Sequence, residues 1–322
     1  MAGTVRVLRE AEVRAALDMA ACIEVLAPAF AAYTTGAAEL PSVIHLDVPE
    51  ARGEVHVKAG HLHGAPTYAV KVASGFSAQE PPAIDGMVVV FDARTGAPVA
   101  LLLDGGYLTD LRTGAAGGVA ARHLAPTRVA TVAVVGTGAQ ARKQIEALAV
   151  VRPGVAEVRV WGRHEDRAAA AASDIGTILP GASVDVAESP DAAVVGADVV
   201  ITCTAAREPL VRGDWIGSGV HVTAVGSDGE GKQELDPALL RKADLLVVDS
   251  RVQAERLGEL QHAPDLADRA VELGEICAGT TEGRSDQRQI TVCDLTGVGV
   301  QDVAAANAVL ANVGDRGQIL EL

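Results

Sequence analysis

Residues 129–141 read Val-Ala-Thr-Val-Ala-Val-Val followed by Gly-Thr-Gly-Ala-Gln-Ala. The first seven residues are an almost continuous apolar run, which is typical of a parallel strand buried on both faces. In the six that follow, Gly136 suits a tight turn, Gly138 lets a pyrophosphate approach the backbone, and Ala141 lets a helix pack close to the sheet. We therefore expect a strand, a glycine loop and a helix whose N-terminus binds a dinucleotide.

The chain downstream of this loop favours that interpretation over an ordinary glycine turn. Short apolar runs alternate there with segments of helical spacing, some of them rich in alanine. The expected strands cover residues 158–161, 183–186, 198–202, 220–225 and 245–248. Strands that alternate with helices predict an α/β fold with a Rossmann-type doubly wound parallel sheet.

The chain upstream of the loop has a different pattern. Residues 10–34 and 107–123 have helical spacing, and the residues between them form short strands separated by turns. A last helix over 299–313 can return to this part of the chain. We expect two domains. They are an α+β substrate-binding domain of residues 1–125 with 301–322, and a Rossmann dinucleotide-binding domain of residues 126–300.

The composition limits the class of protein. The 322 residues include 27 Lys+Arg against 42 Asp+Glu, a net charge of −15, which excludes a nucleic-acid partner. The N-terminus lacks the apolar core of a signal peptide, and no apolar run approaches the ~20 residues of a membrane span. The four cysteines have no pairing pattern. We expect a cytoplasmic protein with no membrane partner.

The second strand of the expected Rossmann sheet bears on the choice of cofactor. It ends in Trp161-Gly-Arg163-His164, without the Asp or Glu that usually bonds the ribose 2′-hydroxyl of NAD. Because Arg163 can face a 2′-phosphate, we expect NAD(P)H with a preference for NADP. The alternative is a solvated arginine that pairs with Glu165 or Asp166.

Three cationic residues lie in largely apolar segments of the first domain: Lys58, Lys71 and Arg112. Lys71 can simply point away from the core. Strand alternation places it on one face with Ala69 and Ala73, whose small side chains leave room for a ligand. An arginine fork suits a carboxylate, and a lysine supplies a charge and a proton.

Asp228 follows the expected strand 220–225, at the edge where ligands bind in open α/β sheets. A carboxylate there can accept a proton beside a nicotinamide, and the alternative is an aspartate that only forms a turn. The neighbouring histidines His56, His61 and His63 lack a cysteine or acid at metal-ligand spacing, so we expect no metal site.

Together these segments resemble the ornithine cyclodeaminase/μ-crystallin family over nearly the whole chain. The segments that carry the resemblance are Ala69-Val-Lys-Val72, Asp104-Gly-Gly-Tyr-Leu-Thr-Asp-Leu-Arg-Thr-Gly-Ala-Ala116, the glycine loop, Gly226-Ser-Asp228 and Asp294-Leu-Thr-Gly-Val-Gly-Val-Gln-Asp302. The segments around Lys58, Leu257 and Ile290 are most similar to the ectoine-utilisation cyclodeaminase-like branch, which includes iminosuccinate reductases.

This resemblance implies a homodimer built through the first domain and an active site between the domains. Lys71 would contact the substrate carboxylate or assist proton transfer, Arg112 would grip the carboxylate, and Asp228 would handle the amine proton or a water. The residues expected to bind the cofactor are Thr113, Gly136, Thr137, Gly138, Ala139, Gln140, Arg163, Thr202, Gly226 and Val300.

One departure from the family concerns the substrate. Ornithine cyclodeaminases have an acidic residue at the position of Lys58, suited to the distal ammonium group of ornithine. A lysine there would repel that group and attract a second carboxylate, for which His45 is a further candidate ligand.

We therefore expect an NAD(P)H-dependent reductase that converts an imino acid, such as iminosuccinate, to an amino acid. Two alternatives stay open. A cyclodeaminase would retain and recycle NAD, and Lys58 counts against it. A non-catalytic NADPH-binding protein of the μ-crystallin type would not need the three cations Lys58, Lys71 and Arg112, which are all present.

Overall fold

Residues 129–141 fold into a buried strand, a glycine loop and a helix, as the sequence predicts. The computed structural model describes residues 3–76 and 83–322, and in it β8 (Thr131–Val135) leads through the loop into α4 (Ala139–Val151). Gly136 has a φ of 134°, and a Cβ there would lie 2.6 Å from the carbonyl oxygen of Cys203. Glycine is required at this turn because a side chain would fit neither the backbone conformation nor the space.

The strand β8 lies inside an eight-stranded sheet whose recorded pairings are all parallel. The strand order is β10-β9-β8-β11-β13-β17-β15-β16. The chain runs outward from β8 to β10 and then crosses to the other side of β8 to form β11. Such a reversal opens a crevice at the carboxyl ends of the two strands, and the glycine loop lies at this edge. The predicted Rossmann-type sheet is confirmed.

The elements that follow β8 extend this sheet and cover it. Its other strands are β9 (Glu157–Trp161), β10 (Ser183–Val186), β11 (Val199–Thr202), β13 (His221–Ala224), β15 (Leu245–Val248), β16 (Val271–Glu272) and β17 (Thr291–Asp294). A separate two-stranded sheet contains β12 (Arg207–Val211) and β14 (Gln233–Leu235). The remaining α-helices are α5 (Glu165–Ile178), α6 (Pro190–Val194), α7 (Pro237–Lys242), α8 (Arg251–Leu257) and α9 (Leu273–Cys277), and a 3₁₀ turn, η3, covers Glu259–His262.

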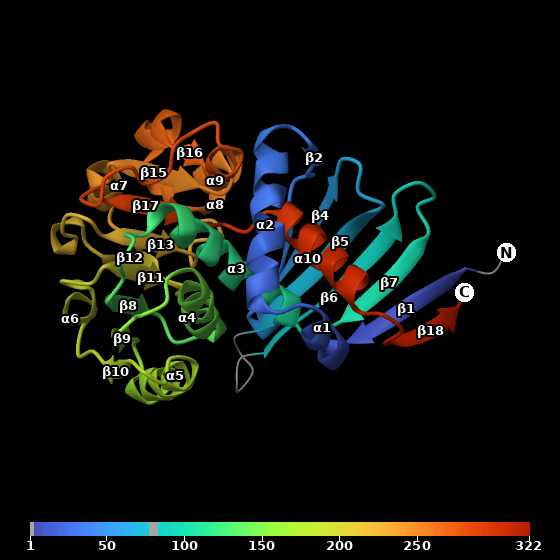
Figure 1. The fold of residues 1–322 in the computed structure, drawn as a ribbon, viewed down its shortest axis with the longest axis horizontal. Helices are drawn as coiled ribbons and strands as arrows, with labels where there is room; N and C mark the ends of the chain where they lie inside the picture. The colour runs from blue at the N-terminus through green and yellow to red at the C-terminus, as the bar shows by residue number, and fades with distance from the viewer. Residues whose placement is uncertain (1–2, 77–82) are drawn as a thin grey trace. The chain divides into compact units, whose positions relative to one another are not determined.

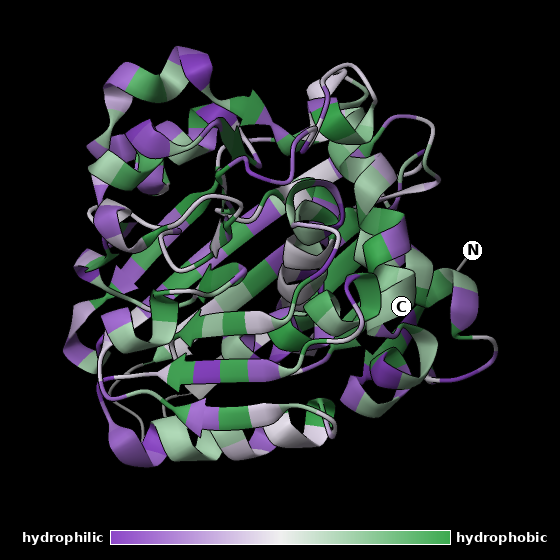
Figure 2. Ribbon diagram, turned by 60° about the vertical axis from the view of Figure 1, so that its left-hand side comes forward, coloured by the Kyte–Doolittle hydropathy of each residue, from purple (hydrophilic) through white to green (hydrophobic). Residues whose placement is uncertain are grey.

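Alternate side chains of β8 pack into different cores on the two faces of the parallel sheet. Val132 and Val134 join a cluster with Ile145 of α4, whereas Ala133 and Val135 join one that contains residues of α7. Apolar residues are concentrated along these strands (Figure 2). Burial on both faces explains why the strand is an apolar run without alternation.

The N-terminal strands form a second eight-stranded sheet, in which most pairings are antiparallel. Its order is β18-β1-β7-β6-β5-β4-β2, and β3 pairs with β4. The strands are β1 (Thr4–Arg9), β2 (Ala38–Glu39), β3 (Ile44–Val48), β4 (Gly53–Leu62), β5 (Thr67–Phe76), β6 (Ala83–Asp92), β7 (Pro98–Leu103) and β18 (Gln318–Glu321). In this register Lys58 of β4 lies directly opposite Lys71 of β5.

Helices cover one face of this second sheet. The helix α10 (Gly299–Asn312) packs against α2 (Met19–Thr34) and against β4 and β5 (Figure 1). The single helix predicted over residues 10–34 is wrong, because α1 (Glu10–Ala16) ends before α2 begins. Asp18 makes the break: its carboxylate accepts a hydrogen bond from the backbone N–H of Ala21 at 2.8 Å and so caps a new helix.

The helix α3 (Tyr107–Leu124) joins two compact units of the chain. Unit 1 comprises Met1–Arg112 with Val298–Leu322, and unit 2 comprises Thr113–Gly297. These units divide inside α3, between Arg112 and Thr113, and again just before α10, between Gly297 and Val298. The expected domain boundaries, after residue 125 and after residue 300, stay a prediction.

Within residues 3–76 and 83–322, no single helix is long and apolar enough to cross a membrane. The bent pair of α1 and α2, with an angle of 76° between them, satisfies the criteria of length and composition only.

Candidate active site

Two lysines project from the helix-covered face of the sheet in unit 1. Lys58 and Lys71 are cross-strand neighbours, and only 8% and 2% of their surfaces are exposed. Strand alternation puts Lys71 on the same face as Ala69, which is also buried, while Val70 and Val72 point to the opposite face. The lysines are therefore not solvated side chains that point away from the core.

Asp302 binds two of the three predicted cations. Its Oδ1 lies 2.9 Å from Lys71 Nζ and 2.9 Å from Arg112 Nε. Arg112 Nη1 also donates a hydrogen bond to Gln301 Oε1 at 2.7 Å. Residues from β5, α3 and α10 thus meet at one carboxylate, and all of them are buried.

The charges in this group do not balance. Lys58, Lys71 and Arg112 share the buried interior of unit 1 with two buried carboxylates, Asp302 and Asp104. Asp104 interacts electrostatically with Lys71 and also accepts a hydrogen bond from the backbone N–H of Leu108 in the first turn of α3, so two carboxylates stand against three cations. An excess of buried positive charge is unfavourable unless an anion accompanies it, so the group is suited to bind a carboxylate.

The pKa values in the group reflect this imbalance. Burial, followed by the charge of Arg112, lowers the pKa of Lys71 to about 7. Burial alone would raise the pKa of Asp302, but the charges of Arg112 and Lys71 bring it below its usual value. Lys71 can therefore hold or release a proton near neutral pH while Asp302 stays ionised.

Two polar atoms beside these cations have no partner among the described residues: Gln301 Nε2 and Asp302 Oδ2. The amide orientation of Gln301 is fixed because the guanidinium of Arg112 can only donate to its oxygen. The group thus offers a bound molecule one free donor and one free acceptor besides its positive charge. An amino or imino acid, with a carboxylate and a nitrogen, fits this set.

His45 lies beside the group and does not join it. Its ring is 4.6 Å from that of His56 in a T-shaped contact, and its Nε2 is 3.0 Å from Asp47 Oδ1. His56 is two residues before Lys58 on β4, so both face the same side of the sheet. A role for His45 in holding a second carboxylate stays a prediction.

The glycine loop of unit 2 has the space and the donors that a pyrophosphate needs. A Cβ on Gly138 would meet no atom within 4 Å, and no side chain caps the N-terminus of α4 that this residue begins. Arg142 Nη1 donates hydrogen bonds to the carbonyl oxygens of Thr137 and Gly138, which orders the loop. The loop residues Gly136, Thr137, Gly138, Ala139 and Gln140 therefore fit a dinucleotide.

Arg163 is exposed in the turn after β9. Among the described residues, no ion pair joins it to Glu165 or Asp166. The alternative of a locally paired surface charge is thus not what the structure has, and its guanidinium can meet a ligand.

Four other predicted residues of unit 2 have polar partners within the protein. The hydroxyl of Thr202 and the backbone N–H of Gly226 both donate to Glu234, and Asp228 Oδ1 lies 2.7 Å from Lys232 Nζ. The carbonyl oxygen of Thr113 accepts a hydrogen bond from Gln144 Nε2 at 2.9 Å.

The predicted residues fall into two sets. Lys58, Lys71 and Arg112 come together in unit 1, with His45 beside them, and Val300 is buried in the first turn of α10, which begins at Gly299 as predicted. The cofactor residues from Thr113 to Gly226, and Asp228, belong to unit 2. That Asp228 and Lys71 act together on one substrate stays a prediction.

Sequence reasoning missed the roles of Gln301, Asp302 and Glu234. Gln301 and Asp302 stand in the Asp294–Asp302 segment, but their contacts with β5 and α3 join residues about 190 positions or more apart. The sequence offers no local signal for these contacts, because the partners are distant in the chain.

The chain matches the model of the ornithine cyclodeaminase/μ-crystallin family over residues 4–317. Over 326 residues it is 41% identical to an uncharacterized cyclodeaminase of Sinorhizobium fredii, and the match covers 97% of each chain.

Two solved structures are similar over 99% of both chains. An archaeal alanine dehydrogenase dimer with bound NAD is 32% identical, with a TM-score of 0.89. The iminosuccinate reductase of Paracoccus denitrificans, in complex with NAD⁺, is 30% identical, with a TM-score of 0.86.

Two glycines of the loop allow packing and cofactor binding to be tested separately. Gly136→Ala should destabilise the fold by roughly 2 kcal/mol or more, because of the positive φ and the contact with Cys203. Gly138→Ala should leave stability unchanged within about 0.5 kcal/mol, since its Cβ would meet open space, yet weaken dinucleotide binding. Urea unfolding and titration of NADH fluorescence measure the two effects. Unchanged NADH affinity in Gly138→Ala would place the pyrophosphate elsewhere.

The depressed pKa of Lys71 predicts a pH-dependent stability. Between pH 7 and 10.5 the folded chain binds fewer protons at Lys71 than the unfolded chain, so this lysine costs stability at pH 7 that is regained as the pH rises. Lys71→Met should therefore be more stable than the wild type at pH 6–7 by about 1 kcal/mol or more, with the difference shrinking toward pH 10. Urea unfolding at several pH values measures this, with Lys143→Met on α4 as control. A difference in the free energy of unfolding that does not change with pH would show that the folded state does not lower the pKa of Lys71.

Proposed function

This chain belongs to the ornithine cyclodeaminase/μ-crystallin family, and on that premise we propose that it reduces an imino acid to an amino acid with NAD(P)H. The observation that carries the proposal is a buried group of cations in which Lys71 and Arg112 share one oxygen of Asp302. A carboxylate-bearing substrate would supply the missing negative charge. The dinucleotide loop of unit 2 and the reductases and dehydrogenases among the relatives support the same reaction class.

The residues of unit 1 suggest how the substrate is held. Arg112 would bind the α-carboxylate through its guanidinium fork, and Lys71 would lie against the same end of the substrate. Lys58, on the neighbouring strand, would bind a second carboxylate. We therefore propose a dicarboxylic substrate, iminosuccinate, which becomes aspartate.

The reduction adds one hydride and one proton across the C=N bond. Bound NAD(P)H would supply the hydride to the imine carbon, and the electron pair of the C=N bond would take a proton at nitrogen. Lys71 is suited to deliver that proton because its pKa of about 7 lets it be charged or neutral under the working conditions. Asp228, part-exposed beside Lys232, would receive or relay the proton of the product amine.

Arg163 supports use of NADPH. It is exposed after β9, in a turn where no carboxylate ends the strand to bond a ribose 2′-hydroxyl. The guanidinium would instead bond a 2′-phosphate. The related alanine dehydrogenase and iminosuccinate reductase structures hold NAD and NAD⁺, so a preference for NADP would distinguish this chain from both.

The uncovered face of the sheet in unit 1 supports a homodimer. Opposite Lys58 and Lys71 lies a face, called here the outer face, of apolar side chains that are exposed or half-buried. Its members are Ile44, Leu46, Val55, Val57, Tyr68, Val70, Val72, Met87, Val89, Phe91, Leu101 and Leu103. Apolar faces of this size mark protein interfaces, and a related alanine dehydrogenase is a dimer. We propose that a second copy of the chain covers it.

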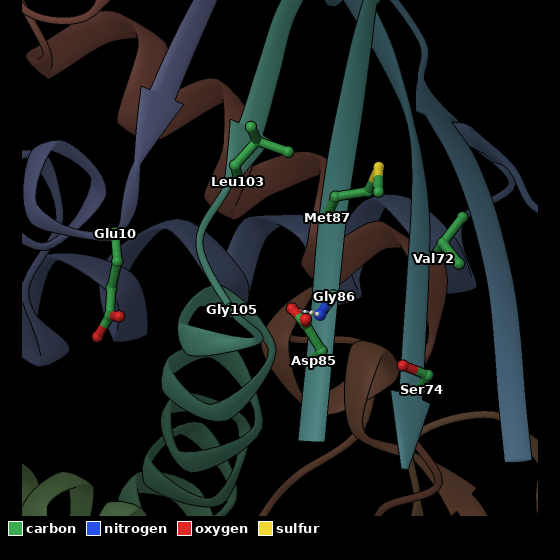
Figure 3. A pocket seen from close by; sticks show the side chains of 8 residues that line it. All are labelled: Glu10, Val72, Ser74, Asp85, Gly86, Met87, Leu103 and Gly105. Carbon is green, nitrogen blue, oxygen red and sulfur yellow. Dashed lines mark hydrogen bonds between the residues drawn. The ribbon is translucent and has the colours of Figure 1, made fainter. Parts of the chain in front are cut away.

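A pocket of about 510 Å³ lies on this outer face, lined by Val72, Met87 and Leu103 among others (Figure 3). These side chains point away from Lys71, so the pocket is separated from the cationic group by the sheet. We assign it to the proposed dimer interface and not to substrate binding.

The reaction is tested by the absorbance of NADH or NADPH at 340 nm with oxaloacetate, pyruvate or glyoxylate, each with and without ammonium. Cofactor oxidation that requires both oxo acid and amine is the expected result, with oxaloacetate best and NADPH preferred. Absence of oxidation with every pair would contradict the proposed reaction and direct attention to deamination of ornithine or lysine on retained NAD.

Lys58 should decide the charge of the substrate. Lys58→Glu should lower kcat/KM for oxaloacetate with ammonium by roughly 10²-fold, because a repelled distal carboxylate costs about 2–5 kcal/mol, and should lower it far less for pyruvate. Lys58→Met, which removes the charge without reversing it, should lie between. Equal losses on both substrates would rule out a second carboxylate at Lys58.

Negative charges placed on the outer face of both copies should prevent dimer formation, because the two faces would repel each other. The wild type should have twice the mass of one 32.9 kDa chain by light scattering, and Val72→Asp with Met87→Asp should give the monomer. Val252→Asp, at a residue of α8 that is 72% exposed, serves as control. A double variant that keeps the wild-type mass would place the interface on another surface.

A further inference from the structure

Glu234 is a fully buried carboxylate in unit 2 that has no part in the reaction proposed above. It lies on the short strand β14, next to the carboxyl ends of β11 and β13. A carboxylate buried at the edge of a sheet would destabilise the fold unless hydrogen-bond donors surrounded it.

Four donors surround the side chain of Glu234. Its Oε1 accepts hydrogen bonds from the backbone N–H and the hydroxyl of Thr204, at 2.6 and 2.8 Å. Its Oε2 accepts from the hydroxyl of Thr202 and the backbone N–H of Gly226, both at 2.8 Å. Burial raises the pKa of Glu234, and these four donors favour the ionised form. The carboxylate therefore joins the segment after β11 to the segment after β13.

The sequence of the second segment is adapted to this carboxylate. A Cβ on Gly226 would collide with the carbonyl oxygen of Thr204 and would lie 2.6 Å from Glu234 Oε1. The glycine of the Gly226-Ser-Asp228 segment is thus required by its close approach to Thr204 and Glu234, whatever its role toward a cofactor.

The position of Asp228 follows from these contacts. Gly226 is held by Glu234, and the hydroxyl of Ser227 donates to the carbonyl oxygens of Lys232 and Leu257. Asp228 comes next in the chain. With two consecutive residues fixed, the backbone of Asp228 has little freedom, although its side chain is 42% exposed.

The backbone of strand β14 is itself bound by a second buried acid, Glu259. Glu259 Oε1 accepts a hydrogen bond from the backbone N–H of Glu234 at 2.8 Å, and Glu259 Oε2 accepts from that of Leu235. The backbone N–H of Glu259 in turn donates to Asp294 Oδ2 at the end of β17. Glu234 is thus attached to the main sheet through two further buried acids, Glu259 and Asp294.

From this geometry we propose that Glu234 is a positioning residue for Asp228: by binding Gly226, it sets the place from which Asp228 handles the amine proton. The inference rests on the proposed function, since it assigns a purpose to Asp228. A glutamine could not replace Glu234, because in either orientation its NH₂ group would face a backbone N–H of Thr204 or Gly226.

The test combines a loop readout with a double-mutant cycle on the full-length protein. Glu234→Gln should speed hydrogen exchange of the amides of residues 226–232 while β8 and β11 stay protected. It should also lower kcat by roughly 10²-fold with little change in KM for the cofactor, as expected for a misplaced proton-handling group. In an Asp228→Asn background the same substitution should cause no further loss of kcat. Glu230 is an exposed acid of the same loop, and Glu230→Gln should match the wild type in hydrogen exchange, in kcat and in KM for the cofactor.

The outcomes separate this inference from the proposed function. Losses that multiply in the double variant, or loop exchange equal to that of the wild type, would overturn the positioning role. If Glu234→Gln does not fold, Glu234→Asp replaces it, since it keeps the charge but cannot span the distance to both segments. A wild type that oxidises no cofactor would contradict the proposed reaction, and the exchange data would still decide whether Glu234 holds the loop.

Discussion

The contact of Asp302 with both Lys71 and Arg112 is the interaction on which unit 1 depends, because it makes the burial of adjacent cations possible. It joins the centre of the sheet, the helix that continues into unit 2 and the last helix of the chain. Lys71 and Arg112 share one oxygen of this carboxylate. Burial, followed by the charge of Arg112, lowers the pKa of Lys71, and a carboxylate ligand would offset that positive charge.

Much of the fold can be predicted from local pattern. The apolar run 129–135 and the glycines after it identify the central strand of unit 2. Burial on both faces requires apolar residues, and the positive φ at position 136 requires glycine, so both are visible in the sequence. The break between α1 and α2 escapes such reasoning because the apolar spacing continues across Asp18. The place of β17 between β13 and β15 also escapes it, as strand order depends on contacts distant in the chain.

The candidate site divides in the same way. Lys58, Lys71 and Arg112 can be found because a charge in an apolar segment is conspicuous, and strand alternation brings the two lysines to one face. Their partners cannot be found so easily. Asp302 and Glu234 look like ordinary acids in the sequence, and only the three-dimensional structure shows that each is buried and surrounded by donors.

The pairing of β1 with β18 has a consequence for how the chain is made. Thr4 of β1 lies opposite Glu321 of β18, so β1 acquires its outer neighbour only after residues 318–321 have been synthesised. Unit 2 is continuous in sequence and can fold before those residues are made. Unit 1 is complete only after α10 has been synthesised, because this helix carries the Asp302 that binds Lys71 and Arg112. A nascent chain can therefore form the Rossmann-type unit before Asp302 reaches Lys71 and Arg112, and the apolar sheet of unit 1 needs protection from aggregation during that interval.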